Sequence, residues 1–308
     1  MIDPRLQTLR VLRQHGTVTA TAAALHLTPS TVSQQLRGLA RELGVELLEQ
    51  VGRRVQLTAA AHALLRHADL LAAQSERARA ELAAHRTGIA GVLRISAMPT
   101  AFTALVAPAA ARLRDANPGL AIELVEDESV HCFDLLLAGD TDIAFVLPAP
   151  GTPAPDDSRF DQRVLLEEPM DLLVPAGHRL AGRESVELAE VAADPWISGR
   201  EWITHHLVVS SACAAAGFTP RIVGRTVHFN GVAAMVANGF GVSLISRLAL
   251  IPPGMAVVRL PLHGDTVPIR RHLTVVRRGA REHPVIAEGL RVIRQVCHAR
   301  TDVTVLDE

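Results

Sequence analysis

The sequence predicts a helical head that ends in a small β-hairpin, then one long helix, and then an α/β body. Residues 5–58 hold three short helical segments followed by two short apolar runs around a Gly-Arg-Arg turn. Residues 58–86 contain no glycine or proline, which favours one continuous helix. From residue 91 onward, strand-like segments alternate with helical ones, the pattern of an α/β fold. At 308 residues the chain is long enough for two or three domains.

The head is expected to occupy residues 1–58. Residues 5–15 place leucines at helical spacing, residues 19–25 form a short alanine-rich helix, and residues 30–43 form the next helix, which Gly44 ends. Two short strands then flank residues 51–54. This order is that of a winged helix-turn-helix, whose second motif helix enters the major groove of DNA.

The helix after Pro29 is the candidate recognition helix. Its apolar stripe, which we expect in the core, consists of Val32, Leu36, Leu39 and Leu43. The residues on the other side that we predict to face DNA are Pro29, Ser30, Thr31, Ser33, Gln34 and Arg37. Glutamine pairs well with adenine, and arginine binds guanine or phosphate. The alternative for each is a solvated helix face, and proline and serine at a helix start are also ordinary capping residues.

Three further residues of the head are candidate phosphate contacts. Arg53 and Arg54 lie at the tip of the hairpin, where an arginine enters the minor groove or holds the backbone; the alternative is a solubilising turn. Thr19 lies near the start of the second helix and either caps it or contacts a phosphate.

The charge distribution agrees with a nucleic-acid contact confined to the head. Residues 1–90 carry 11 Arg against 7 acidic residues, whereas residues 91–308 carry 20 Arg against 25. The chain has no tyrosine and 3% aromatic residues, which disfavours the stacking that binds single-stranded bases. Double-stranded DNA is therefore the expected polymer partner.

The long helix, residues 59–88 with its flanks, has a heptad pattern. Spacings of four and three alternate along a stripe consisting of Leu57, Ala61, Leu64, Ala68, Leu71, Ser75, Ala78 and Leu82. Such a seam favours a partner helix and hence a dimer. The alternative is a helix that packs along its own domain.

The body, residues 89–308, contains two sets of α/β segments. They predict βαβ units in a mostly parallel sheet and two subdomains with a cleft between them. We expect subdomain I in about residues 91–163 and 269–308, and subdomain II in about residues 164–268.

The chain resembles the LysR-type transcriptional regulators over almost its whole length. In the head the resemblance rests on Gly16-Thr17-Val18-Thr19, Leu25-His26-Leu27-Thr28 and Arg53-Arg54-Val55-Gln56-Leu57-Thr58, and in the body on Gly139-Asp140-Thr141-Asp142 and Asn238-Gly239-Phe240-Gly241. Departures from the family pattern are Thr21, Pro29-Ser30, Ala40, Ala59-Ala60-Ala61 and Ser246. Pro29-Ser30 lies where members often read bases, so operator preference is expected to differ.

The resemblance implies an effector domain of the periplasmic-binding-protein type, which binds a small molecule between its subdomains. It also implies a sequence-specific regulator controlled by that effector, and a homodimer or homotetramer. The residues that follow predicted strands, where ligands of open α/β sheets bind, are Thr100, Ala101, Ser129, Ser198, Thr204, His228 and Phe229. A helix begins near residue 102, and its free N–H groups favour a carboxylate. A capping role for Thr100 and a core role for Phe229 remain alternatives.

We expect no cofactor and no metal. The pair His205-His206 lacks helical i, i+4 spacing and a carboxylate partner. Cys132, Cys213 and Cys297 are odd in number and far apart, which favours reduced thiols in a cytoplasmic location, with a redox-sensing pair as the alternative. Neither a secretion signal nor a membrane-spanning run is present in the sequence, so no membrane partner is expected.

Two other functions compete with the regulator. An enzyme with an appended DNA-binding head would need a catalytic motif, and GxSxG, P-loop and HExxH are absent. Gly239-Phe240-Gly241 also lacks the third glycine of a dinucleotide fingerprint. A sequence-blind architectural protein would need a more basic surface and has no use for a two-lobed body.

Overall fold

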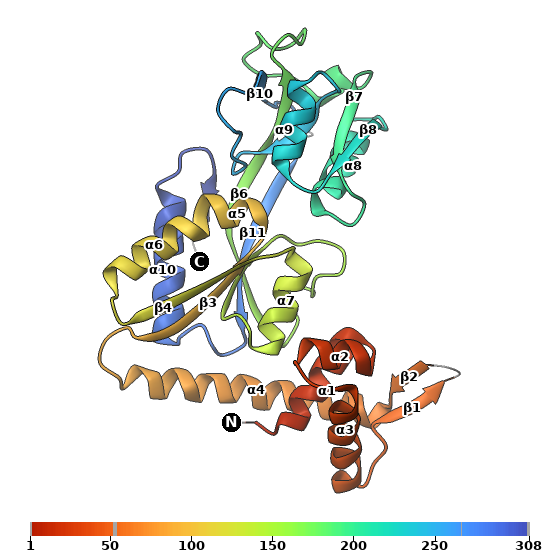
Figure 1. Cartoon of the computed structure of the whole chain (residues 1–308), viewed down its shortest axis with the longest axis vertical. Helices are drawn as coiled ribbons and strands as arrows, with labels where there is room; N and C mark the ends of the chain where they lie inside the picture. The colour runs from red at the N-terminus through yellow and green to blue at the C-terminus, as the bar shows by residue number, and fades with distance from the viewer. Residues whose placement is uncertain (1, 52–53, 266, 307–308) are drawn as a thin grey trace.

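The computed structural model describes residues 2–51, 54–265 and 267–306. A helical head and a long helix lie at one end, and the two subdomains of the body follow one above the other (Figure 1).

The head is a winged helix-turn-helix. It consists of α1 (Pro4–His15), α2 (Val18–Ala24) and α3 (Pro29–Leu43), followed by the antiparallel pair β1 (Leu48–Val51) and β2 (Arg54–Leu57). The hydroxyls of Thr17 and Thr28 accept from backbone N–H groups in the first turns of α2 and α3, and Gly44 ends α3 in the left-handed conformation. These local signals explain why the helix boundaries were predictable.

The core of the head contains Val32, Leu36 and Leu39 as predicted. The prediction for Leu43 is wrong, because this side chain is 46% exposed. Leu43 is the last residue of α3, and the buried stripe of the helix ends at Leu39.

The long helix α4 (Ala59–Ala84) begins inside the head. Ala61, Leu65 and Ala68 are buried in the head core, and Leu57 and Leu64 pack against it. The predicted seam is therefore wrong for Ala61 and Ala68, because they are fully buried within their own chain. Of the other seam positions, Leu71 is 55% and Leu82 is 64% exposed.

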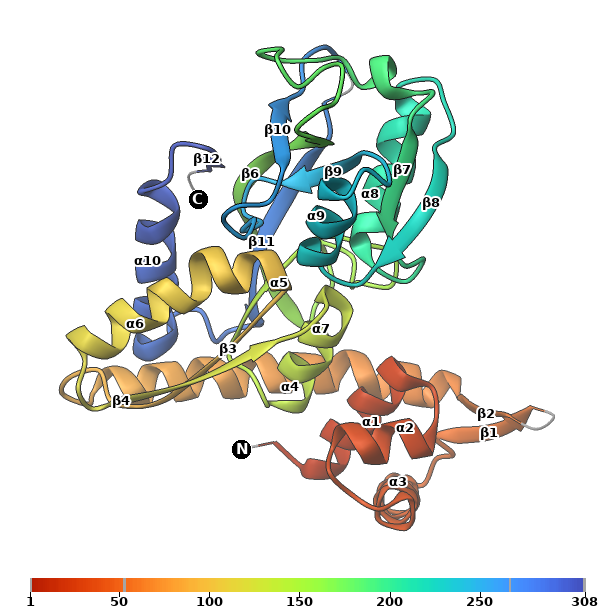
Figure 2. The ribbon, with the colours of Figure 1, turned by 45° about the horizontal axis from the view of Figure 1, so that its top comes forward.

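The second half of α4 runs beneath the body (Figure 2). Gly279, which has a φ of +87°, approaches the backbone carbonyl of Ala73 so closely that a Cβ atom would not fit. A glycine is therefore required at this crossing.

Subdomain I is built on the parallel strands β3 (Gly91–Ala97), β4 (Leu120–Glu126) and β5 (Ile143–Val146). A short helix α5 (Pro99–Ala101) and a π-helical turn at Phe102–Val106 lead into α6 (Ala107–Ala116). α6 and α10 (Pro284–His298) share one hydrophobic cluster with β3, whereas α7 (Ser129–Ala138) shares another with β5.

Two long antiparallel strands, β6 (Phe160–Pro175) and β11 (Ile269–Arg277), run through both subdomains. In subdomain II, β6 pairs with β9 (Ser243–Ser246) and β10 (Val257–Pro261), and in subdomain I with β12 (Thr304–Val305). The other elements of subdomain II are a 3₁₀ turn at Leu188–Val191, the parallel strands β7 (Pro195–Gly199) and β8 (Arg221–Thr226), and the helices α8 (Thr204–Ala215) and α9 (Phe229–Ala237).

The expected mostly parallel sheet is wrong. β6 and β11 cross between the subdomains in opposite directions, so their pairings with β5, β9, β10 and each other are antiparallel. Leu165 and Leu166 belong to the core of subdomain I and Met170 to that of subdomain II. The two cores thus meet along β6.

Among the described residues, we find no helix that has both the length and the apolar surface needed to cross a membrane.

Candidate DNA-binding surface and effector cavity

The outer face of α3 is polar and accessible. Pro29, Ser30, Gln34 and Arg37 are exposed, and Thr31 and Ser33 are half-buried. The guanidinium Nε of Arg37 donates to the backbone carbonyl of Ser33 at 3.2 Å, so the side chain lies along the helix surface. α3 lies on the side of the head away from the body (Figures 1 and 2). This face is therefore free to meet DNA.

The structure describes the other predicted DNA contacts, Thr19, Arg53 and Arg54, to different extents. Thr19 is exposed on α2, while the cap is Thr17, whose Oγ1 accepts from the Ala20 N–H at 3.1 Å. Arg53 lies outside the described residues, and for Arg54 the structure places only the backbone, in β2. The contacts of both arginines with DNA remain predictions.

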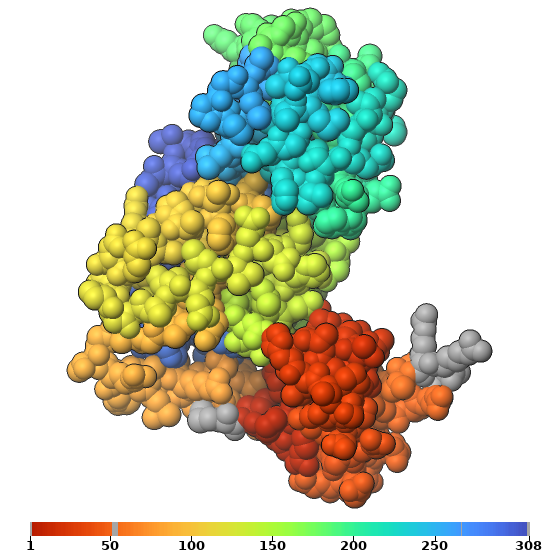
Figure 3. All heavy atoms as spheres, in the orientation of Figure 1, coloured from red at the N-terminus to blue at the C-terminus, as the bar shows by residue number. Residues whose placement is uncertain are grey.

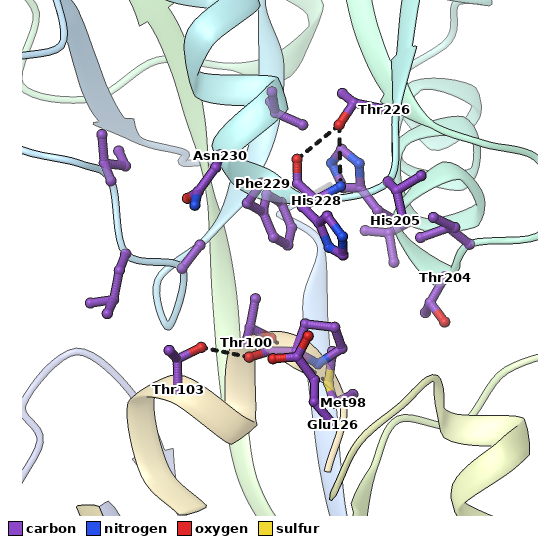
Figure 4. A pocket seen from close by; sticks show the side chains of 18 of the residues that line it. Met98, Thr100, Thr103, Glu126, Thr204, His205, Thr226, His228, Phe229 and Asn230 are labelled. Atoms are coloured by element: carbon purple, nitrogen blue, oxygen red, sulfur yellow. Dashed lines mark hydrogen bonds between the residues drawn. The ribbon is translucent and has the colours of Figure 1, made fainter. Parts of the chain in front are cut away.

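A cavity of about 650 Å³ lies between the two subdomains, and we call it the effector cavity. Subdomain I contributes Met98, Thr100, Thr103, Glu126 and Glu128, and subdomain II contributes Thr204, His205, Thr226, His228, Phe229 and Asn230. Figure 4 shows the labelled side chains of the two subdomains on opposite sides of it. Apolar residues such as Leu147, Met170 and Ile203 complete the wall. A mostly apolar cleft with a few polar groups is typical of a small-molecule site.

Four of the seven predicted effector contacts line this cavity: Thr100, Thr204, His228 and Phe229. The other three, Ala101, Ser129 and Ser198, do not line it. Ala101 is fully buried in the core of subdomain I.

The hydroxyl of Ser129 is turned inward and accepts from the Leu147 N–H at 3.0 Å. Ser198 is fully buried, with its Oγ 3.2 Å from Nδ1 of His206. Both serines follow strand ends as predicted, but their hydroxyls serve the protein's own hydrogen bonds.

Sequence reasoning missed several lining residues, among them Arg270 at the start of β11. It lines the cavity, yet its residue surface is only 6% exposed. Its Nη2 donates to Oγ1 of Thr100 at 3.1 Å, and its Nη1 lies 3.7 Å from Oε2 of Glu168. Strand alternation was the available signal, because Arg270 and His272 point inward whereas Arg271 between them is exposed.

Glu168 on β6 is the counter-ion of this arginine. Its carboxylate accepts from His272 Nε2 at 2.8 Å, from the Leu248 N–H at 2.8 Å and from the Ser246 hydroxyl. Burial disfavours its charge, but Arg270 and His272 hold the pKa of Glu168 well below its usual range. Burial in turn lowers the pKa of His272. Arg270 in the cavity wall thus interacts with Glu168 across β11 and β6, the two strands that join the subdomains.

Two other titratable groups in the wall have shifted pKa values. Burial lowers the pKa of His205 to about 4, and the neutral ring donates from Nε2 to the Leu244 carbonyl at 2.9 Å. Burial, aided by Asp127, raises the pKa of Glu128. Arg270 is the one arginine among the described lining residues, which include no lysine.

The comparisons with known proteins agree with this geometry at both ends of the chain. Residues 4–62 match the family described as "Bacterial regulatory helix-turn-helix protein, lysR family". Residues 86–298 match the family described as "LysR substrate binding domain". The chain belongs to the LysR family of transcriptional regulators. It is thus a DNA-binding transcription regulator with an effector-binding domain, and not an enzyme.

Curated LysR-family relatives are similar over most of their length. The HTH-type transcriptional regulator ShiR of Corynebacterium glutamicum (strain R) is 29% identical over 265 residues, which cover 84% of this chain and 88% of ShiR. AlsR of Bacillus subtilis (strain 168) is also 29% identical, over 74% of each chain.

Solved structures of LysR-family members show the same fold. A full-length OxyR variant from Pseudomonas aeruginosa has a TM-score of 0.66 at 20% identity and covers 100% of this chain and 98% of its own. HinK from Pseudomonas aeruginosa has a TM-score of 0.61 at 23% identity, with coverage of 95% and 97%. Full-length BenM has a TM-score of 0.60 at 22% identity, with coverage of 98% and 99%. At these identities the likeness concerns the fold alone.

The three cysteines of the body are free and buried. Burial raises the pKa of each of the three free thiols, in Cys132, Cys213 and Cys297, to about 12. They are therefore thiols at neutral pH, the poorly reactive form. Within the described ranges, no group of three or more His, Cys, Asp or Glu residues could hold a metal ion.

Proposed function

We propose that a small carboxylate binds in the effector cavity, in the cytoplasm, and thereby controls how this LysR-family regulator binds its operator. The observation that carries the proposal is the buried guanidinium of Arg270 in the cavity wall. A carboxylate accepts two parallel hydrogen bonds from a guanidinium, and the interaction is stronger where water is excluded.

The charge pattern of the wall supports this ligand class. Glu168 lies 3.7 Å from Arg270, too far for a hydrogen bond, so the guanidinium retains donors for another anion. Thr100 also lines the cavity, and its hydroxyl accepts from Arg270, which orients the guanidinium there. The apolar residues of the wall favour a carboxylate that carries an apolar group.

On the DNA side, we propose that Ser33 and Gln34 contact the major groove and that Arg37 contacts a phosphate. The exposed polar face of α3 and the core packing of its opposite face support this assignment. Two heads set about one helical turn apart, ~34 Å, would read the two halves of a pseudo-palindrome.

A dimer through the second half of α4 would supply the two heads. Leu71 and Leu82, together with Ala78, lie on one stripe of the helix, and the two leucines are more than half exposed. Exposed leucines at heptad spacing are typical of a helix that pairs with a second copy.

A thermal-shift screen tests the ligand class. Small carboxylates and their neutral amides are added to the wild type, to Arg270→Met and to the control Arg271→Met, and each shift is measured against the same variant without ligand. We expect a carboxylate that stabilises the wild type and the control but not Arg270→Met. A ligand whose amide works equally well, or which stabilises Arg270→Met as much as the wild type, would refute the proposal.

A gel shift tests the DNA side. The expected result is a specific shift, at physiological salt, with DNA upstream of the protein's own gene. Equal affinity for random DNA would instead favour a sequence-blind architectural role.

A further inference from the structure

The DNA-binding head is docked on the body within the same chain, along helix α7. Val11 of α1 is 1% exposed and belongs to one hydrophobic cluster with Phe133, Leu136 and Leu137 of α7. Leu25, just after α2, packs against the same cluster. Figures 1 and 2 show α7 beside α1 and α2, and Figure 3 shows the head in contact with the body.

Polar contacts surround this hydrophobic cluster. The amide of Gln7 donates to the Leu137 carbonyl, and Arg159 Nη1 donates to Gln14 Oε1 at 2.8 Å. At the edge, His15 Nε2 lies 3.8 Å from a carboxylate oxygen of Asp134.

The buried carboxylate of Asp69, on α4, lies at the same contact between head and body. Asp69 is 4% exposed and accepts from Arg10 Nε at 2.8 Å and from Arg13 Nη2 at 2.9 Å. The hydroxyl of Ser158, from the body, lies 3.4 Å from the same carboxylate. Head, linker helix and body therefore share one buried polar centre, which fixes the orientation of the head.

The other end of α7 forms part of the effector cavity. Glu128 is the N-cap residue of α7 and lines the cavity. Ser129 in the first turn accepts from the N–H of Leu147, which also lines the cavity. α7 has ten residues, a length of about 15 Å. The N-cap residue of this short helix thus lines the cavity, and the last two turns of the helix contact the head.

We propose that α7 couples the effector cavity to the DNA-binding head directly, within a single chain. A ligand that displaces Glu128 or Leu147 shifts α7, and the hydrophobic cluster in which Val11 is buried shifts with it. Because Phe133 and Leu136 are buried and close-packed, the helix moves as a unit. The contact between head and body leaves the polar face of α3 exposed. It therefore sets the orientation of the recognition helix and does not block DNA from reaching that helix.

Coupling between two sites is reciprocal, so DNA bound to the head acts back on α7. This provides a test that needs no effector. Its failure is therefore distinguishable from failure of the proposed carboxylate site, on which the ligand half of the coupling rests.

The first experiment is hydrogen exchange of the full-length protein, with and without the upstream DNA fragment. We expect DNA to slow amide exchange in residues 129–138 of the wild type by at least about threefold. Val11→Ala should abolish this effect. The matched control is Leu12→Ala, on the same helix but in the head's own core, and it should retain the effect.

The second experiment is a double-mutant cycle on DNA affinity between Val11→Ala and Glu128→Gln. The fold-change in DNA affinity of the double variant should differ from the product of the two single fold-changes by at least about threefold. The cycle between Leu12→Ala and Glu128→Gln should be multiplicative. If Val11→Ala reduces the folded fraction, Gln14→Ala, which removes the contact with Arg159, replaces it in both experiments.

Unchanged exchange in residues 129–138 of the DNA-bound wild type would overturn the proposal. So would two cycles that are both multiplicative.

Discussion

Glu168 and Glu167 are adjacent on β6 but face opposite environments, so they form a matched pair for a stability measurement. Glu168 is fully buried and faces Arg270, whereas the Glu167 side chain is 25% exposed and pairs with an Arg271 side chain that is 67% exposed. The substitutions are Glu168→Gln and Glu167→Gln, which change shape very little.

The expected cost differs several-fold between the two. Glu168→Gln removes the negative charge next to a buried guanidinium and replaces an acceptor oxygen with a donor, opposite the donors of His272 and Leu248. Breaking a buried pair by removing one partner costs about 3–5 kcal/mol. Glu167→Gln breaks a surface pair, which is worth about 1 kcal/mol or less.

Urea unfolding followed by tryptophan fluorescence measures both costs, because Trp196 is fully buried in subdomain II. The difference should also depend on pH. The pKa of Glu168 is depressed in the folded protein, so its contribution is complete above the unfolded value of 4.5 and is lost as the pH falls further. Equal losses of less than about 1 kcal/mol for both variants would refute the assignment of Glu168 as a required counter-ion.

Three further predictions concern DNA binding, assembly and acid stability. Gln34→Ala should weaken operator binding by about 1–3 kcal/mol and relax specificity at one base pair, whereas Arg37→Ala should weaken binding to all sequences and lower the salt slope by about one, both measured by fluorescence anisotropy. Truncating Leu71 and Leu82 together to alanine should weaken the dimer by at least about 2 kcal/mol in sedimentation equilibrium, since two exposed leucines per chain lose their contact. The pKa of His205 falls from 6.5 to about 4 on folding, so the unfolded chain binds the proton first as pH falls through this window. Stability should therefore decrease from pH 6.5 towards pH 4, by at most about 1.4 kcal/mol per pH unit from this group, and His205→Gln should lose less over the same range.

The predictions on DNA binding and assembly each have a control on the same element. Arg41→Ala, one turn beyond Arg37, should change the salt slope less if the contact is local to the start of α3. Arg66→Ala with Arg77→Ala truncates two long exposed side chains on another side of α4 and should leave the dimer intact. A urea midpoint that falls equally for wild type and His205→Gln between pH 7 and pH 5 would exclude His205 as the titrating group.

The head was predictable because its information is local. Thr17, Thr28 and Gly44 mark helix ends through side-chain caps and a left-handed residue, and the spacing of Val32, Leu36 and Leu39 defines the buried stripe. No long-range contact is needed to read these signals.

The partner of a helix face is not local information. Ala61 and Ala68 have the spacing of a dimer seam, but small residues pack equally well against the helix's own domain, and here they do. The heptad pattern therefore identified a buried face without identifying what covers it.

The effector cavity was predictable in position but only partly in composition. Strand ends placed Thr100, Thr204 and His228 correctly, because topology alone sets where strands end. Topology does not determine which way a side chain points, as the inward-pointing hydroxyl of Ser129 shows. Arg270 acquires its role from Glu168, on a strand far away in the sequence, and local spacing carries no record of that pairing.

The measurement that tests the account most directly is DNA affinity as a function of ligand concentration, in the wild type and in Arg270→Met. The ligand is the carboxylate that the thermal-shift screen identifies, and the DNA is the upstream fragment. The account predicts that the carboxylate changes the Kd for DNA in the wild type by about 5-fold or more and leaves that of Arg270→Met unchanged. An equal change in both proteins, or no change in the wild type at saturating carboxylate, would contradict it.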